Sequence, residues 1–213
     1  MTLIAVDNGF DNTKVRTKDR LFHFKSRWEK TDDTSENGIL KYNNEMWINR
    51  GMDDIEMDKS KSIIHKLSTL KSLSEHCHLS QEFNLVLDLP LIHYRNKDFK
   101  EEFEEYMSNP KIDYVNYNGV DKELIIKSCT VAPQGVVALY SDVSMYKNRT
   151  IGVIDLRGIT DDCCIVENLK PIKESITTIN MGSKIIESRV KTRINEKYML
   201  NIQDYEMSNI IRN

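Results

Sequence analysis

The stretch that decides the fold lies near the start of the sequence and reads Leu3-Ile4-Ala5-Val6-Asp7-Asn8-Gly9-Phe10-Asp11-Asn12-Thr13-Lys14. Four apolar residues run directly into a polar turn with a glycine at its tip, and residues 14–18 leave on the other side. This pattern predicts a buried strand, a tight turn and a returning strand. Backbone N–H groups of Asn8, Gly9 and Phe10 can point into the concavity of such a turn and bind an anion, and Lys14 can add a positive charge.

Asp7, at the end of the first strand, would repel a bare phosphate. It fits such a site if a hydrated Mg²⁺ lies between them, because Mg²⁺ keeps several of its waters and favours carboxylate and phosphate oxygens. A plain polar hairpin explains the stretch equally well, since Asp-Asn-Gly is also a common turn sequence. The residues alone leave both interpretations open.

The chain of 213 residues is long enough for one large domain or two modest ones. Its hydrophobic content of 39% supports a core, and its net charge of −3 argues against general nucleic-acid binding, which requires a basic face. No segment has membrane-spanning length and no basic start precedes an apolar stretch, so we expect a cytoplasmic protein without direct contact to membrane or nucleic acid. Four cysteines without a Cys-x-x-Cys pair predict reduced, structural thiols, with Cys163 and Cys164 on opposite faces of a strand.

Strands and helices alternate along the chain in a way that predicts a mixed α/β fold. Further strands are predicted at residues 21–24, 39–42, 45–48, 83–89, 112–117, 123–131, 150–156, 162–166 and 175–179. Helices are predicted at residues 59–77, 98–107, 133–143 and 183–197. The helix at 59–77 places its leucines and isoleucines on one face and should be amphipathic, whereas the charged residues 27–37 predict a loop.

A second strand and turn repeat the order of the first. Val153-Ile154-Asp155-Leu156-Arg157-Gly158 matches Ile4-Ala5-Val6-Asp7-Asn8-Gly9, since each is an apolar strand, an aspartate and a glycine turn that feeds another strand. The match predicts a degenerate internal duplication. We expect a first lobe over residues 1–149, with a small β-rich subdomain near residues 25–60, and a partial second lobe over residues 150–213. Two such turns facing each other across a cleft would hold a nucleotide's phosphates from both sides.

Four segments, in this order, resemble the actin/Hsp70/sugar-kinase superfamily and, within it, the ParM-type bacterial plasmid-segregation actins. The first is Asp7-Asn8-Gly9 with Asn12 and Lys14, and the second is the strand end Leu89-Pro90-Leu91. The third is Val131-Ala132-Pro133-Gln134-Gly135-Val136-Val137-Ala138-Leu139-Tyr140, and the fourth is Asp155-Leu156-Arg157-Gly158-Ile159-Thr160-Asp161-Asp162. The resemblance spans nearly the whole chain. It implies an α/β fold of actin-like (ribonuclease H-like) mixed sheets flanked by helices, with an incomplete second lobe.

The resemblance also implies roles for individual residues. Asp7 would hold a water of the Mg²⁺ shell, and Asp155 would act with the metal or a water. Gln134 would position the hydrolytic water, an orienting role seen in other phosphate-cleaving enzymes. Lys14 would neutralise phosphate charge. The other residues implied to lie along the bound nucleotide are Asn8, Gly9, Phe10, Asn12, Arg157, Gly158, Thr160 and Gly182.

By the same resemblance, the chain would bind ATP or GTP with Mg²⁺, self-associate into filaments for plasmid partitioning, and hydrolyse the nucleotide slowly. Its partner would be an adaptor protein bound to plasmid DNA. Phe10 and Arg157 depart from the family pattern, which has a small polar residue and a glycine there, and no glycine follows Gly182. These departures favour an alternative, a shortened and catalytically weak filament cap or regulator. A small-molecule kinase of the same superfamily is a third reading, although no sugar-binding constellation is visible.

Other conspicuous residues have simpler explanations. His76-Cys77-His78 lacks a second cluster that would complete a metal site. Charge runs on helices are usually solvated, which explains the glutamates at 101, 102, 104 and 105. The basic residues Lys184, Arg189, Lys191 and Arg193 indicate either a solvated helix surface or a contact with another protein or filament subunit. Trp28 and Trp47 either contact other subunits or close the core of the small subdomain.

Overall fold

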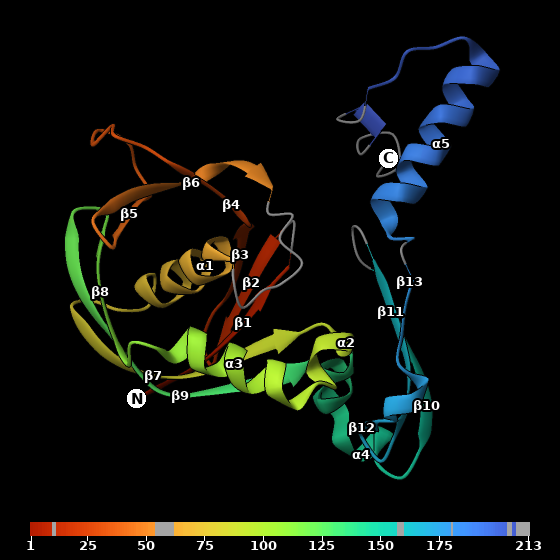
Figure 1. Ribbon diagram of the computed structural model, residues 1–213, viewed down its shortest axis with the longest axis horizontal. Helices are drawn as coiled ribbons and strands as arrows, with labels where there is room; N and C mark the ends of the chain where they lie inside the picture. Colours follow the sequence, from red (N-terminus) through yellow and green to blue (C-terminus); the bar gives the residue numbers. More distant parts are fainter. Residues whose placement is uncertain (10–11, 54–61, 157–159, 180, 204–205, 208–213) are drawn as a thin grey trace. The chain divides into compact units, whose positions relative to one another are not determined.

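The computed structural model describes residues 1–213 except residues 10–11, 54–61, 157–159, 180, 204–205 and 208–213 (Figure 1). The chain divides into two compact units, unit 1 at Met1–Pro133 and unit 2 at Gln134–Asn213. The sequence pattern places the lobe boundary later, between residues 149 and 150.

Unit 1 is built on a mixed sheet, which has nine strands in the described residues, in the order β3-β2-β1-β7-β9-β8-β5-β6-β4. β1 pairs with β2 antiparallel and with β7 parallel, and β7 pairs with β9 parallel. The carboxyl ends of β1, β7 and β9 therefore meet at one edge of the sheet, where ligands bind in open α/β sheets. The strands are β1 (Thr2–Asn8), β2 (Asn12–Thr17), β3 (Leu21–Lys25), β4 (Arg27–Lys30), β5 (Ile39–Tyr42), β6 (Glu45–Asp53), β7 (Ser80–Leu89), β8 (Ile112–Tyr117) and β9 (Val120–Pro133).

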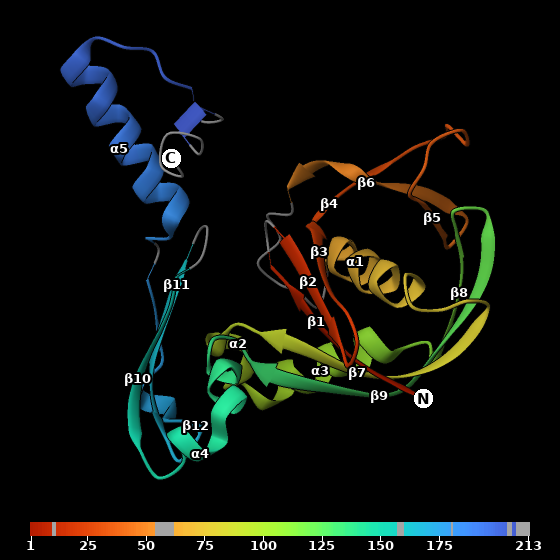
Figure 2. The same cartoon turned by 180° about the vertical axis from the view of Figure 1, so that it is seen from behind.

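The helix predicted over residues 59–77 is α1 (Ile63–Ser74), which begins at the N-cap Ser62. Figures 1 and 2 show the sheet of unit 1 curling around α1, so that strands lie on more than one side of it. Nine of its twelve residues are buried, including Lys66 and Ser68. The predicted helix is present, and its polar side is largely buried as well as its apolar side, because the sheet curls around it.

Lys66 shows how α1 accommodates a buried charge. Its Nζ donates to Asp113 Oδ2 at 2.9 Å and to the Met107 carbonyl oxygen at 3.2 Å. The side chains of Lys66 and Asp113 are only 3% and 0% exposed. A buried ammonium group requires such partners, because an unpaired one carries a large desolvation cost. The pair ties α1 to β8 and to the end of α3 (Lys97–Ser108).

Two short-range signals place the second helical segment correctly. Asn96 caps α3 by accepting hydrogen bonds from the N–H groups of Asp98 and Phe99, and the helix ends before Asn109-Pro110, as predicted. The four-residue helix α2 (Leu91–Tyr94), which follows Pro90, is not predicted from the sequence. Phe103 and Met107 of α3 join α1 and the strands in one buried core.

The tryptophans belong to this core. Trp28 and Trp47 are 5% and 8% exposed, and Trp28 Nε1 donates to Ser68 Oγ at 2.9 Å. Of the two explanations open from the sequence, closure of the core is the one the structure shows. Trp28 lies in β4, so the loop predicted for residues 27–37 is wrong at its start.

Unit 2 contains a smaller sheet and separate helical segments. β10 (Thr150–Leu156) pairs antiparallel with β11 (Asp161–Glu167), which also pairs with β12 (Lys170–Pro171) and β13 (Thr177–Ile179). The helical segments are η1 (Val136–Asp142), α4 (Val143–Tyr146), η2 (Lys173–Ser175) and α5 (Ser183–Tyr198). Pro133 ends β9 instead of opening a helix, because Gly135 follows with a φ of 76° and η1 begins only after it.

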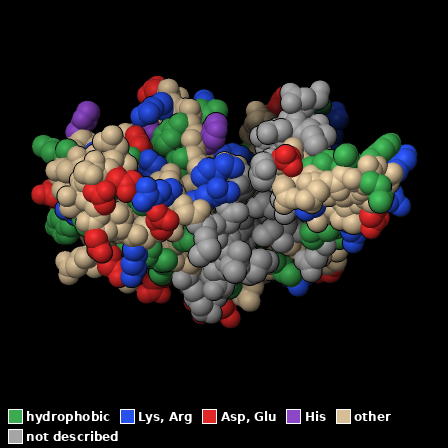
Figure 3. All heavy atoms as spheres, turned by 90° about the horizontal axis from the view of Figure 1, so that it is seen from above, with side chains coloured by type: hydrophobic (Ala, Val, Ile, Leu, Met, Phe, Trp, Pro, Cys, Tyr) green, Lys and Arg blue, Asp and Glu red, His purple; other side chains and the backbone are tan. Residues whose placement is uncertain are grey.

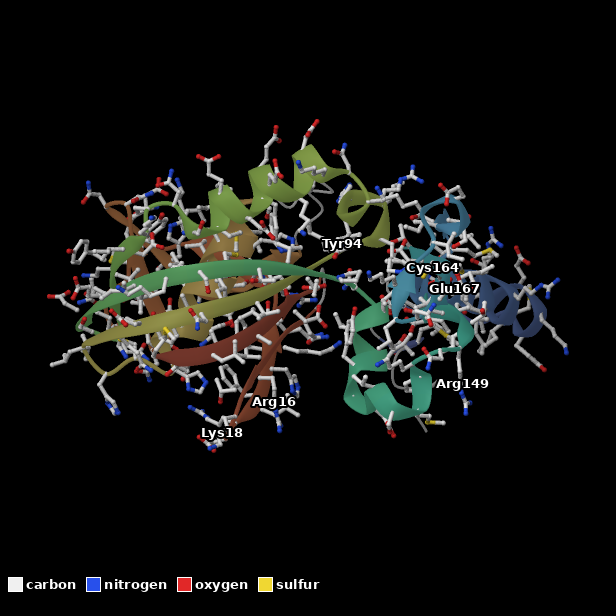
Figure 4. All side chains as sticks on the ribbon, turned by 90° about the horizontal axis from the view of Figure 1, so that it is seen from below. Arg16, Lys18, Tyr94, Arg149, Cys164 and Glu167 are labelled. Carbon is white, nitrogen blue, oxygen red and sulfur yellow. The ribbon has the colours of Figure 1, made fainter. Side chains whose placement is uncertain are left out.

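The described cysteines are all free thiols, as predicted. Cys164 is buried and its neighbour Cys163 is half-buried, in agreement with opposite faces of β11. Figure 4 shows Cys164 and Glu167 on the strands of unit 2. The structure as a whole confirms the mixed α/β class.

Candidate functional site

The hairpin of β1 and β2 holds the first predicted phosphate-binding turn. Asp7 and Lys14 are directly opposite each other in this hairpin, and Lys14 Nζ lies 3.2 Å from Asp7 Oδ2. Their side chains are 37% and 65% exposed, and an ion pair at that exposure adds little to folding stability. The pair therefore sits at the carboxyl edge of the parallel strands, at a surface where both side chains can meet a ligand.

One oxygen of the Asp7 carboxylate is suited to binding hydrated Mg²⁺. Its Oδ1 atom is buried and has no hydrogen-bond partner among the described residues. A buried carboxylate oxygen of this kind gains stability from a donor such as a metal-bound water. The residues present thus fit a magnesium ion held through water at Asp7, and the ion would neutralise charge on a bound phosphate.

Two of the expected anion-binding N–H groups are engaged inside the protein. The Gly9 N–H donates to the Asn12 carbonyl oxygen at 3.1 Å, and the Asn8 N–H donates to Asp88 Oδ1 at 3.2 Å. The expectation that these two donors face an anion is corrected accordingly, whereas Phe10 lies outside the described residues. Gly9 is still required, because a Cβ atom there would lie 2.9 Å from the Asn12 carbonyl oxygen.

The second predicted turn joins β10 and β11, but Arg157 and Gly158 lie outside the described residues. On either side of it, Asp155 is directly opposite Asp162, as Asp7 is opposite Lys14 in the first hairpin. Asp162 is fully buried and accepts a hydrogen bond from Thr178 Oγ1 at 2.7 Å, and Thr160 is also buried. In both units the described strands on either side of the predicted turn pair antiparallel.

Gln134 and Asp155, the two residues predicted to act in catalysis, both lie in unit 2. A Cβ atom built on Gly135 would lie 3.0 Å from Asp155 Cβ, so the backbone next to Gln134 packs directly against Asp155. Gln134 itself is 8% exposed. Gly182, predicted to lie near the base or ribose, is the buried N-cap residue of α5.

Sequence reasoning missed Asp88. This carboxylate is 8% exposed and lies at the end of β7, where it binds the backbone of the first turn. A signal was present, because Asp88 is a lone charged residue within the apolar run Leu85-Val86-Leu87-Asp88-Leu89. A charge in a strand of that kind is rarely buried without a partner.

Other candidate sites gain no support. The described residues contain no group of three or more His, Cys, Asp or Glu side chains that could hold a metal ion. The His76 ring packs against Phe22, and burial lowers the pKa of His76. On the face of unit 1 seen in Figure 3, acidic and basic side chains are interspersed. No helix in the described part of the chain is both long enough and apolar enough to cross a membrane.

Comparison with known proteins identifies the family. Residues 5–136 match the family model described as actin like proteins N terminal domain, which covers more than half of the 213 residues. The chain therefore belongs to the actin-like proteins. A comparison with curated protein sequences gives no significant match.

Solved structures show the same fold. An archaeal actin homolog, Ta0583, has a TM-score of 0.83 at 17% identity, over 98% of this chain and 71% of that chain. The apo ParM protein of psk41 has a TM-score of 0.73 at 15% identity, over 99% of this chain and 77% of that chain. The AlfA filament from a B. subtilis plasmid, pLS32, has a TM-score of 0.69 at 18% identity, over 94% and 80%. The predicted actin-like fold is confirmed.

Proposed function

We propose that this chain is a filament-forming, nucleotide-binding protein of plasmid partitioning. It would bind ATP or GTP with Mg²⁺, assemble into filaments with copies of itself, and hydrolyse the nucleotide slowly. In the cytoplasm, the filaments would engage an adaptor protein bound to plasmid DNA, without direct contact of this chain to nucleic acid or membrane.

The observation that carries the proposal is the Asp7–Lys14 pair at the carboxyl end of β1. It places one carboxylate and one ammonium group 3.2 Å apart at the surface, with a buried Asp7 oxygen that has no partner among the described residues. Lys14 would neutralise phosphate charge as a compact point charge, and Asp7 would hold a metal-bound water. Structural neighbours add support, since Ta0583 is described in complex with ADP and the AlfA filament as bound to AMPPNP.

Unit 2 carries further residues that we propose for nucleotide binding and hydrolysis. Asp155 would act with the metal or a water, and Gln134, on the segment packed against Asp155, would orient the attacking water. Thr160 and Gly182 would lie along the nucleotide. Asn8 is only 2% exposed, so its role would be to support the turn from beneath instead of contacting the ligand.

Sedimentation tests the proposal. The purified chain is centrifuged with Mg-ATP, with Mg-GTP and without nucleotide, and we expect pelleting only with nucleotide. Lys14→Ala and Asp155→Ala should abolish pelleting, because Lys14 would neutralise phosphate charge and Asp155 would act with the metal or a water. Lys18→Ala is the matched control, since Lys18 is exposed beyond the opposite end of β2 and points outward in Figure 4.

Three outcomes separate the candidates. Nucleotide-dependent pelleting that the Lys18→Ala variant retains and the other two lose supports the proposal. Nucleotide binding without pelleting favours the alternative of a catalytically weak cap or regulator. Equal pelleting of all variants, or pelleting that ignores nucleotide, contradicts the assignment of the site.

A further inference from the structure

A cluster of buried polar residues lies directly beneath the first turn. Its members come from β1, β2, the residue before β4, α1 and β7, and all are between 0% and 8% exposed. They are Asn8, Thr13, Ser26, His65, Thr69 and Asp88. Burying polar groups costs free energy unless they bind one another, so a cluster of this size at the edge of a core calls for an explanation.

The side chain of Asn8 is at the centre of this cluster. Its Nδ2 donates to Thr69 Oγ1 at 2.9 Å and to the His65 carbonyl oxygen at 3.4 Å. Its Oδ1 accepts a hydrogen bond from Thr13 Oγ1 at 3.3 Å, and Thr13 Oγ1 is also 2.9 Å from Ser26 Oγ. An asparagine amide has one acceptor oxygen and two donor hydrogens, so these contacts occupy it within the protein.

The backbone of Asn8 is held from the other side by Asp88. The register of β1 against β7 ends with Val6 opposite Leu87. Beyond that point, the side chain of Asp88 binds the next part of β1, and its Oδ1 accepts a hydrogen bond from the Asn8 N–H at 3.2 Å. A hydrogen bond from a backbone N–H to a carboxylate is stronger than one between neutral groups, so it orients the peptide where the turn begins.

We infer that Asp88 and Asn8 are positioning residues of the first turn: they fix the backbone at Asn8 and Gly9, and so hold Asp7 and Lys14 in place, without touching the nucleotide. The expected effect on nucleotide binding rests on the proposed function, but the positioning of the turn by Asp88 and Asn8 does not. Asp7 and Lys14 lie directly opposite each other on the two strands that leave the turn, so a rotated peptide at Asn8 would displace the pair.

The test compares variants that differ in one hydrogen-bonding atom. Asp88→Ala removes the acceptor of the Asn8 N–H, and Asp88→Asn keeps an acceptor oxygen of the same reach. Thr69→Val removes one of the two acceptors of Asn8 Nδ2, the nearer one, at nearly constant volume and serves if Asp88→Ala does not fold. Ser72→Ala is the matched control, because Ser72 is also buried on α1 but donates only along its own helix, to the Ser68 carbonyl oxygen at 2.7 Å.

The first readout is Mg-nucleotide affinity by calorimetry. Loss of a hydrogen bond to a charged group in a preorganised site predicts affinity at least about tenfold weaker for Asp88→Ala, and weaker in the same direction for Thr69→Val. Asp88→Asn should recover most of the affinity, and Ser72→Ala should bind within about twofold of wild type. A purely structural role would instead lower the melting temperature of Asp88→Ala and Thr69→Val and leave the affinity of the folded protein unchanged, which would overturn the inference.

The second readout needs no nucleotide. Amide hydrogen exchange followed by NMR should show the Asn8 and Gly9 N–H groups protected in wild type and in Ser72→Ala, and exchanging faster in Asp88→Ala and Thr69→Val. If wild type binds no nucleotide but this pattern holds, the proposed function fails and the positioning of the turn stands. If exchange at Asn8 and Gly9 is the same in all variants, the positioning inference is contradicted whatever the affinity.

Discussion

Replacing one partner of the Lys66–Asp113 pair should destabilise unit 1 severely, whereas replacing both should not. The two side chains are 3% and 0% exposed, with Nζ to Oδ2 at 2.9 Å, so Asp113→Leu leaves an ammonium group in the core with only the Met107 carbonyl oxygen at 3.2 Å. Breaking a buried pair on one side costs about 3–5 kcal/mol. The double variant Lys66→Met with Asp113→Leu removes both charges, and such apolar replacements are often neutral or stabilising.

Urea unfolding followed by tryptophan fluorescence measures this effect for unit 1 alone. The chain has two tryptophans, Trp28 and Trp47, and both are buried in unit 1. With a denaturant slope of about 2 kcal/mol per molar urea, the single variant should lower the midpoint by roughly 2 M. The free energy of unfolding of the double variant should lie within about 1 kcal/mol of the wild-type value. If the single variant does not fold, a double variant that folds with this stability still tests the prediction. A single variant that is as stable as wild type, or a double variant no more stable than the single, would show that the buried pair does not determine the stability of unit 1.

Three further predictions follow from single sites. Burial raises the pKa of Glu75, but hydrogen bonding, chiefly from Tyr117, outweighs burial and lowers that pKa from 4.5. Glu75 thus contributes stability that is present above pH 4.5 and lost as the pH falls through its folded pKa, so Glu75→Gln should flatten the loss of stability below pH 4.5 in urea titrations. Gly135→Ala should destabilise the region around Asp155 by more than about 1 kcal/mol, seen as faster hydrogen exchange in β10, because a side chain is strained at its positive φ. Burial raises the pKa of Cys129 to about 12, so iodoacetamide should leave Cys129 unmodified in the folded protein and label it after unfolding, as peptide mass spectrometry would show; rapid labelling of the folded protein would contradict its burial.

The parts of the fold that depend on local signals could be predicted from the sequence. Asn43 and Asn44 adopt φ values of 51° and 63°, which asparagine tolerates, and the hairpin of β5 and β6 lies where this turn sequence predicts it. Asn109-Pro110 likewise marks the end of α3. In each case the deciding interaction lies within a few residues of the signal.

The features that could not be predicted from the sequence, β4 and the burial of the polar side of α1, depend on contacts between residues far apart in the chain. Strand β4 has one buried residue, Trp28, and forms because it pairs with β6, which its own charged sequence does not reveal. α1 is buried on its polar side because the sheet curls around it, and Lys66 finds its partner Asp113 far along the chain. Periodicity detects an apolar face, but it does not say whether the opposite face meets water or another strand.

In the candidate site, too, the residues that are close in sequence could be predicted and the distant one could not. The hairpin that carries Asp7 and Lys14 is local, and its residues could be named from the sequence. Asp88 is not, because the bond from the Asn8 N–H joins residues on strands that are neighbours only in the folded sheet. For the same reason, the sequence assigned Asn8 to the ligand, while the structure places it beneath the turn with its amide fully engaged.

We propose that this actin-like chain binds a magnesium nucleotide, and calorimetric titration of the purified 213-residue chain measures such binding without further assumptions. The chain is titrated with ATP and Mg²⁺, then with GTP and Mg²⁺, and each titration is repeated with the Lys14→Ala variant. We expect binding with a dissociation constant on the order of micromolar for at least one nucleotide, and loss of that binding in the variant. No binding of either nucleotide at millimolar concentration, or equal binding by wild type and variant, would contradict it.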